Sequence, residues 1–184
     1  EELKKGIAMS DVATVVLKTA AKGYAMRTAT EASMKARVDA GKETPLRKGN
    51  TLYAQNVTDD LVMGYDVELT QCLTHPEAVA LIEGGVVVNS EQGAFQKYTA
   101  PAAGTEVVRT PFTLEVYCID KDTGVAPKGY VKFTYPTCRG KSAVEWDIKD
   151  GDFFTPKLVI RSAPSMGESP MTVDYVDTLP AVSA

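Results

Sequence analysis

Apolar and polar residues alternate with a period of two along much of this chain. In the longest run, residues 61–70, Leu61, Met63, Tyr65, Val67 and Leu69 alternate with mostly polar neighbours. Residues 12–19, 32–38 and 112–118 show the same alternation or a β-branched composition. Because successive side chains of a strand point to opposite faces, this pattern is typical of strands with one buried face. The sequence therefore predicts a mainly β, antiparallel β-sandwich. We expect residues 51–55 to pair with the strand at 32–38.

The stretch from residue 109 to 162 predicts two successive β-hairpins. In the first, strands at 112–118 and 129–135 flank a polar turn that ends at Gly124, and Pro136 ends the second strand. In the second, strands at 143–148 and 153–162 flank the turn dipeptide Asp150-Gly151. Weaker patterns indicate further strands from Val86 and over 171–175.

One helix is predicted over residues 74–83. Thr74 and Glu77 have the spacing of a capping box, and Pro76 stands where its missing N–H is harmless. Gly84 and Gly85 end the helix. A helix of about three turns is unstable alone, so we expect it to pack on the sheet. The predicted packing residues are Thr74, Glu77, Val79, Leu81 and Ile82.

Residues 39–50, DAGKETPLRKGN, lie between predicted strands and combine two glycines, a proline and charges of both signs. A connection of about twelve residues is more often functional than idle, commonly by touching a partner. We predict an extended loop that contacts a neighbouring subunit. The alternative is a solvated hairpin tip. The predicted contact residues are Lys42, Glu43, Pro45, Leu46, Arg47 and Lys48.

Length and charge limit the classes of protein that fit. The 184 residues fit one domain, 1–184, with an N-terminal arm at 1–11 and a C-terminal tail at 177–184. The net charge of −4 argues against a surface that grips nucleic acid by neutralising phosphates. No apolar run approaches the ~20 residues that span a bilayer, and the start lacks a secretory pattern, so we expect synthesis in the cytoplasm.

The residues that carry catalysis or bind cofactors are not found in a recognisable arrangement. The three cysteines, Cys72, Cys118 and Cys138, lack metal-ligand spacing and are expected to be packed and reduced. The one histidine, His75, falls in the predicted capping turn and has no adjacent nucleophile. Residues 120–124 begin like a calcium loop but do not continue as one. We therefore expect neither an enzyme nor a cofactor site.

Several segments, taken in order, resemble a known family. They are KGNTLYAQ, LVMGYDVELTQCLTHPEAVALIEGG, YTAPAAGTEVVRTPFTLEVY, KGYVKFTYPTCRGK and KDGDFFTPKLVIRSAPSMGESPM followed by DTLP. Over roughly residues 41–180 the chain resembles the major tail tube protein of long-tailed, siphovirus-like bacteriophages. The residues before Thr30 do not contribute to the resemblance.

The resemblance implies a β-sandwich with one short helix that assembles into stacked hexameric rings. These rings form a hollow tube in the virion tail, through which DNA is ejected without specific binding. The implied partners are further copies of this chain and the tape-measure, tail-terminator and distal tail proteins. The same fold serves contractile tails and type VI secretion tubes, so fold alone does not separate them.

Acidic residues opposite the apolar rows of predicted strands are candidates for an anionic channel lining that repels DNA phosphates. The alternative is an outward, solvated face. The candidate lining residues are Asp66, Glu68, Glu115, Glu145 and Asp147.

The competing class is a stand-alone carbohydrate-binding or adhesion module. Such a module needs an exposed aromatic platform. Five aromatic residues could provide one, but their alternation along the chain favours core or interface positions instead. They are Tyr98, Tyr117, Tyr130, Tyr135 and Trp146.

Overall fold

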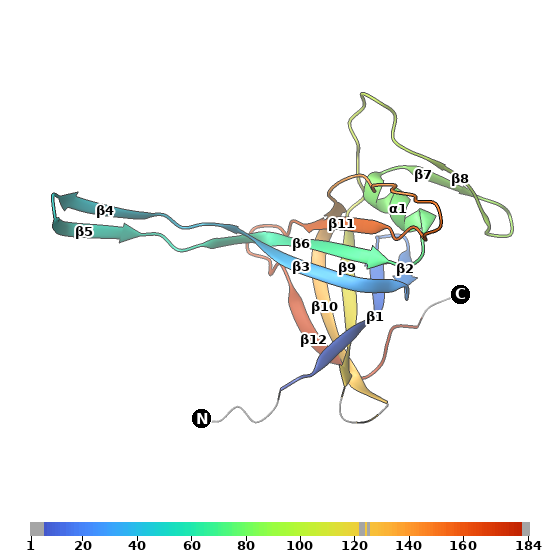
Figure 1. Cartoon of the computed structure of the whole chain (residues 1–184), viewed down its shortest axis with the longest axis horizontal. Coiled ribbons are helices and arrows are strands. Elements are labelled where there is room, and N and C mark those ends of the chain that lie inside the picture. Colours follow the sequence, from blue (N-terminus) through green and yellow to red (C-terminus); the bar gives the residue numbers. More distant parts are fainter. Residues whose placement is uncertain (1–5, 122–123, 125, 182–184) are drawn as a thin grey trace.

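The computed structural model describes residues 6–121, 124 and 126–181, and it confirms a mainly β, antiparallel fold with one short helix. The main sheet has the strand order β2-β1-β9-β10-β11-β6-β3, and β12 also pairs with β10. Two separate hairpins, β4–β5 and β7–β8, extend from this body (Figure 1). The elements are β1 (Met9–Lys18), β2 (Gly23–Met26), β3 (Ala29–Asp39), β4 (Glu43–Lys48), β5 (Thr51–Val57), β6 (Leu61–Gln71), α1 (Pro76–Glu83), β7 (Val86–Asn89), β8 (Phe95–Thr99), β9 (Phe112–Lys121), β10 (Pro127–Gly140), β11 (Lys157–Ser162) and β12 (Thr172–Val176).

The main sheet folds over into two layers that share strand β10. In Figure 1, β3, β6 and β11 run across β9, β10 and β12. The first part of β10 pairs with β9 and β12, whereas Cys138 to Gly140 pair with β11. The change of partner follows a register shift between Tyr135 and Cys138, where Thr137 has a positive φ of 52°. Such a bulge bends a strand and allows it to turn a corner between layers.

Strand β10 also ends later than the sequence predicted. Pro136 does not end β10, which continues to Gly140. A proline lacks the N–H that a ladder requires, but it is tolerated at a bulge, where the regular ladder is already interrupted. The predicted first hairpin, β9–β10, is otherwise confirmed.

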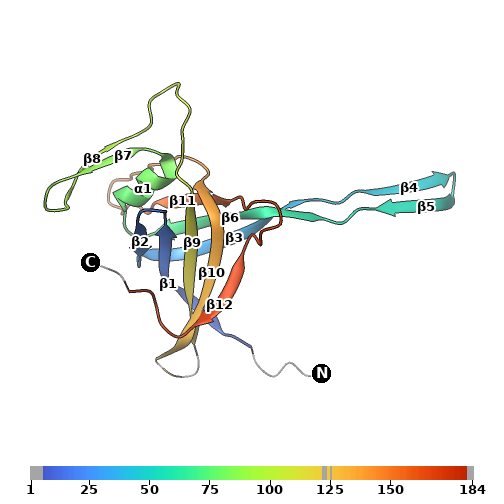
Figure 2. The same cartoon turned by 180° about the vertical axis from the view of Figure 1, so that it is seen from behind.

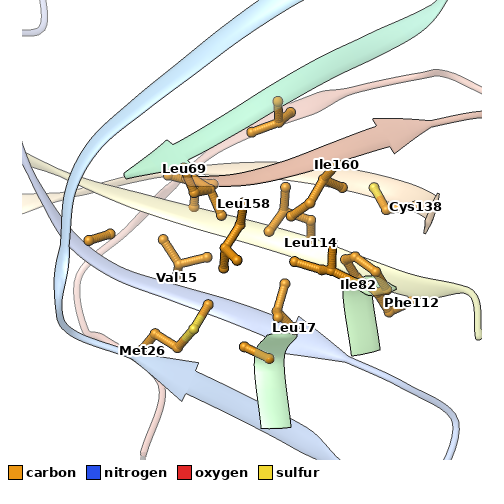
Figure 3. Close-up of a cluster of buried hydrophobic side chains, with 14 of the residues drawn as sticks. Val15, Leu17, Met26, Leu69, Ile82, Phe112, Leu114, Cys138, Leu158 and Ile160 are labelled. Carbon is orange, nitrogen blue, oxygen red and sulfur yellow. The ribbon is translucent and has the colours of Figure 1, made fainter. Parts of the chain in front are cut away.

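The core lies between the two layers, and the predicted alternation explains its composition. Val15 and Leu17 of β1 face the same interior as Leu69 of β6 and Ile160 of β11 (Figure 3). Each of these positions is followed on its strand by a residue on the opposite face. Helix α1 closes one end of this interior with Ile82, which is fully buried.

The predicted second hairpin is wrong. The predicted turn is present, since Gly151 has a positive φ of 78° and the Asp152 N–H bonds to the Lys149 carbonyl. Residues 143–149 form no strand before it, and the second strand is only β11, Lys157–Ser162. On one edge β11 pairs with β6 from Lys157 to Arg161, and on the other it pairs with β10 from Ile160 to Ser162. Past Gly140 the Lys141 N–H still bonds to the Val159 carbonyl, but residues 143–148 do not continue this ladder. The predicted partner of β3 is also wrong: β3 pairs with β6, and β5 pairs with β4.

The helix is confirmed, but its capping box is not. His75 is the N-cap residue and makes no side-chain capping bond, and the Glu77 carboxylate accepts a hydrogen bond from Asn89 Nδ2 at 3.0 Å. The predicted end is correct, since Gly84 takes a left-handed φ of 83° and its N–H bonds to the Ala80 carbonyl. Of the predicted packing residues, Val79 and Ile82 are buried and Leu81 is partly buried.

The predicted strands at both ends of the chain are confirmed as β1 and β12. The predicted N-terminal arm at 1–11 includes Met9, which already pairs with Asp120 of β9. Residues 1–5 and 182–184, the outer parts of the predicted arm and tail, lie outside the described residues. Pro180 and Ala181 of the tail reach a hollow beside β2.

Candidate assembly interface

The most distinctive feature of the molecule is the arm formed by β4 and β5. Every residue of both strands is exposed, and the hairpin extends well beyond the body (Figure 2). Strands Glu43–Lys48 and Thr51–Val57 pair through a two-residue turn at Gly49 and Asn50, where Gly49 has a φ of 59°. The predicted loop at 39–50 is therefore corrected to the end of β3 followed by the first strand and turn of a hairpin.

Hydrogen bonds fix the root of the arm. The Gly41 N–H donates to Asp60 Oδ1 at 2.6 Å, and Lys42 exchanges bonds with Thr58 through both backbone and side chain. A side chain at position 41 would collide with the Thr58 carbonyl oxygen, because a Cβ there would lie 1.7 Å away. The close approach that defines the root thus requires glycine. The arm leaves the body in a defined direction.

Large apolar side chains on the arm face solvent. Their exposed fractions exceed one half, and they lie far from the core of the body. Soluble chains seldom expose grouped apolar side chains unless the surface binds something. An isolated two-stranded hairpin is also only marginally stable in water. Both facts make the arm a candidate binding surface. The exposed apolar residues are Leu46, Leu52, Tyr53 and Val57.

Of the predicted contact residues, all six, from Lys42 to Lys48, are exposed on or beside β4. The contact prediction left out β5, which was expected as a strand over 51–55 but with the wrong partner, and which carries three of the four exposed apolar side chains. Two signals point to this strand: the Gly49-Asn50 dipeptide is a recognised hairpin turn, and residues 51–57 contain several good strand formers.

The predicted channel-lining carboxylates do not lie together. Asp66 and Glu68 share the outer face of β6, but each is matched by cations. Asp66 lies within 3.3 Å of Arg37 and 3.0 Å of both Lys141 and Arg161. Burial alone raises the pKa of Asp66, but hydrogen bonds from Arg161 and Lys141 outweigh it and leave the pKa below its ordinary value.

This outer face carries more positive than negative charge around Asp66. Cross-strand pairing places Lys35, Asp66, Arg161 and Arg139 in one row over β3, β6, β11 and β10. Three of these four side chains are cationic. The row is therefore a cationic surface, and the prediction of an anionic face on β6 is wrong.

Glu115 is also unsuitable as a lining residue. It belongs to β9, in the other layer, and only 6% of it is exposed. Lys18 Nζ and Tyr117 Oη donate hydrogen bonds to its two oxygens at 2.7 and 2.8 Å. Glu145 and Asp147 are exposed, but they lie in the irregular connection at 143–156. The five predicted lining residues therefore do not share one face of the sheet.

Most of the aromatic residues considered for a carbohydrate platform contact other residues of the same chain. Tyr98 donates its hydroxyl to Glu83, Tyr117 donates to Glu115, and the Tyr135 hydroxyl contacts the Met34 sulfur. Trp146 differs from the expectation of a core residue, since it is half exposed. It stacks on Phe154 with ring centroids 5.2 Å apart.

A hollow of about 690 Å³ lies beside β2 and α1. Its polar lining includes Lys18, Lys22 and His75, and the His75 Nε2 is bonded to Thr28 Oγ1 at 2.7 Å. Across the described part of the chain, no three His, Cys, Asp or Glu side chains lie close enough to hold a metal ion. No described helix combines the length and the apolar character needed to cross a bilayer.

Compared with protein-family models and with curated proteins, the chain matches none.

Proposed function

We propose that this protein is a self-assembling structural subunit whose rings of six stack into the hollow tail tube of a long-tailed bacteriophage. The observation that carries the proposal is the β4–β5 arm, a hairpin with a defined root and four exposed apolar side chains. The order of sequence segments that resembles tail tube proteins supports the identity of the assembly. The mainly β body with one short helix is compatible with it.

The arm of one copy would bind a different surface on a second copy, which is a head-to-tail contact. Such contacts generate a closed ring if the rotation closes and a helical filament if it does not. Strands β2 and β3 stand at the ends of the main sheet, and their outer edges offer backbone groups for pairing with a neighbouring copy. Extended arms and sheet edges together provide both kinds of contact that stacked rings need.

DNA passes through this tube without specific binding. Six copies carry 6 × (−4) = −24 per ring, which disfavours adhesion of phosphates. The cationic row at Lys35, Arg139 and Arg161 then faces away from the DNA path. The tube ends contact tail-terminator and distal tail proteins, and the tape-measure protein occupies the tube before ejection.

The test is removal of the arm. Because Lys42 and Thr58 already bond to one another, residues 43–57 can be replaced by an Asn-Gly turn without stretching the chain. We expect the purified parent protein to form rings or tubes in negative-stain electron microscopy. The armless variant should stay monomeric. Its circular dichroism spectrum should show that the residues outside the arm are folded as in the parent protein.

A matched control is Thr44→Ala, which alters an exposed polar position on the same strand and should leave assembly intact. Normal tubes from the armless variant would overturn the role of the arm. A parent protein that stays monomeric at millimolar concentration would overturn the proposed function.

A further inference from the structure

The connection at residues 143–155 forms a second exposed surface of unusual composition. It contains four acidic residues, Glu145, Asp147, Asp150 and Asp152, and a single cation, Lys149, which lies 3.2 Å from Asp147. Large apolar side chains project from the same segment, and Phe153 is 93% exposed. The exposed apolar residues of this acidic aromatic loop are Trp146, Ile148 and Phe153.

The acidic aromatic loop is held in place at both ends. At the start, Val144 is buried and its N–H donates to Glu83 Oε1 at 2.6 Å. At the end, Phe154 packs against the core, and Trp146 stacks on it with an interplanar angle of 19°. A surface that is ordered before binding loses less entropy on binding, so this loop is suited to receive a partner.

A small hollow of about 220 Å³ opens on the loop. It is lined by the acidic residues Glu145, Asp147 and Asp152, by Phe153 and Phe154, and by Lys149 and Lys157, so carboxylates outnumber cations by three to two. At ~30 Å³ per molecule it has room for about seven waters, which is enough space for a side chain to enter. The hollow thus selects a ligand that carries an apolar group next to positive charge.

The tip of the β4–β5 arm has that chemistry. Arg47 and Lys48 flank the turn, and Leu46, Leu52 and Tyr53 lie beside them with exposed side chains. Neither Arg47 nor Lys48 has an ion pair with any described residue. The arm tip is therefore apolar and basic, whereas the loop is apolar and carries a net negative charge.

The two surfaces lie at opposite ends of the body. The arm begins where Asp39 pairs with Leu61, and the loop ends where Lys157 pairs with Thr70. These points are nine residues apart along β6, roughly 30 Å at ~3.3 Å per residue, and the arm extends further away (Figure 1). An arm therefore cannot reach the loop of its own chain.

We propose that the arm tip of one copy docks on the acidic aromatic loop of a second copy. Tyr53 or Leu52 enters the hollow beside Phe153, and Arg47 and Lys48 pair with the acidic residues around it. The inference rests on the proposed self-assembly and names the acceptor surface. The contact joins unlike surfaces, so each copy keeps one free arm and one free loop for the next.

The first test is charge reversal with rescue. Arg47→Glu with Lys48→Glu, and separately Glu145→Lys with Asp147→Lys, should each raise the protein concentration needed for half-maximal assembly at least about tenfold. Combining the two pairs of changes in one chain should restore assembly to within about threefold of the parent. All four positions are exposed, so melting temperatures should stay unchanged.

A second test detects the contact directly by cross-linking. Leu52→Cys and Phe153→Cys, made in separate chains that also carry Cys72→Ser to remove the exposed native thiol, should form a mixed disulfide dimer on oxidation. Glu91→Cys in place of Phe153→Cys provides a matched exposed control and should form little dimer.

The outcomes separate this inference from the proposed function. Suppose that charge reversal on the arm blocks assembly while charge reversal on the loop does not, and that the Leu52→Cys and Phe153→Cys chains form no mixed disulfide. In that case self-assembly stands and the acceptor assignment is overturned. If the parent protein never assembles, both are overturned. Failure of the combined charge swap to rescue assembly also overturns the acceptor assignment.

Discussion

The body and the β4–β5 arm are built from the same kind of strand, yet they differ in what stabilises them. In the body each strand contributes alternate side chains to a shared interior, as Leu69 and Ile160 do. In the arm both faces are exposed from Glu43 to Val57. The apolar side chains of the body are therefore buried within one chain, whereas those of the arm remain exposed to solvent.

This contrast separates the residues that stabilise the fold from those that we propose mediate assembly. Burial of apolar area is the main favourable term in folding, and nearly all of it here comes from the body. The arm adds backbone hydrogen bonds, but two strands without a buried face are only marginally stable. Substitutions in the two regions should thus affect different measurements.

The largest expected difference comes from the same substitution in each region. Leu69→Ala removes a fully buried side chain and should lower the free energy of unfolding by ~2–5 kcal/mol. Leu52→Ala, at a position that is 58% exposed, should change it by less than about 0.5 kcal/mol but weaken assembly. Urea denaturation and sedimentation measure the two effects. Equal losses of stability would mean that the arm folds against its own body.

A second prediction concerns Glu83, a buried carboxylate that ties the β7–β8 hairpin and the acidic aromatic loop to α1. Its oxygens accept hydrogen bonds from Tyr98 Oη and the Val144 N–H. Glu83→Ala leaves both donors without their acceptor and should cost ~2–3 kcal/mol, since hydrogen bonds to charged groups are the stronger ones. Glu91→Ala, at an exposed position between β7 and β8, is the control. Faster hydrogen exchange confined to residues 86–99 and 143–155 would confirm the tie.

The third prediction is a pH dependence of the body that the arm should not share. Burial by itself raises the pKa of Glu115, but hydrogen bonds from Lys18 and Tyr117 outweigh it and hold the pKa below the ordinary value of 4.5. A lowered pKa in the folded state stabilises the protein above pH 4.5, and this stabilisation is lost as the pH falls through the folded-state pKa.

Because Lys18 is half exposed, solvent weakens the pair, and the effect should be about 1 kcal/mol, or a melting temperature ~2–4 °C lower in acid. Thermal melts of the parent and of Glu115→Gln between about pH 3 and 6 test this. The variant should show a smaller decline. An identical decline would place the acid-sensitive carboxylates elsewhere.

The smallest effect is expected at His75. Its ring nitrogen bonds to Thr28 Oγ1, so His75→Ala should cost ~0.5–1.5 kcal/mol, the net value of one hydrogen bond. Leu81→Ala, which shortens a partly buried side chain of α1, should cost more. The reverse ranking in urea denaturation would show that the turn before α1 contributes more than its apolar face.

The sequence predicted most of the body because its strands follow a simple rule. Alternation alone located β6 and β9, and Gly84 marked the end of the helix. The rule failed at residues 143–148, where the same alternation belongs to an exposed loop in which Val144 faces inward and Trp146 stacks on Phe154. Periodicity reports which residues alternate, but not whether an open strand edge is available for pairing.

The candidate interface was predicted only in part for a related reason. The charge and glycine content of residues 39–50 correctly pointed to an exposed segment, but strand pairing extends it to Val57. The cations around Asp66 could not be predicted, because cross-strand neighbours such as Arg161 are distant in sequence and cannot be paired without the register.

The position of β1 in the sheet has a consequence for synthesis on the ribosome. Val15 pairs with Val116, so β1 emerges 116 − 15 = 101 residues before its partner on β9. At about 5–20 residues per second, β1 waits roughly 5–20 s. The β4–β5 hairpin pairs residues near in sequence and forms in microseconds once it has emerged. The nascent chain therefore exposes the β4–β5 segment well before the body can close.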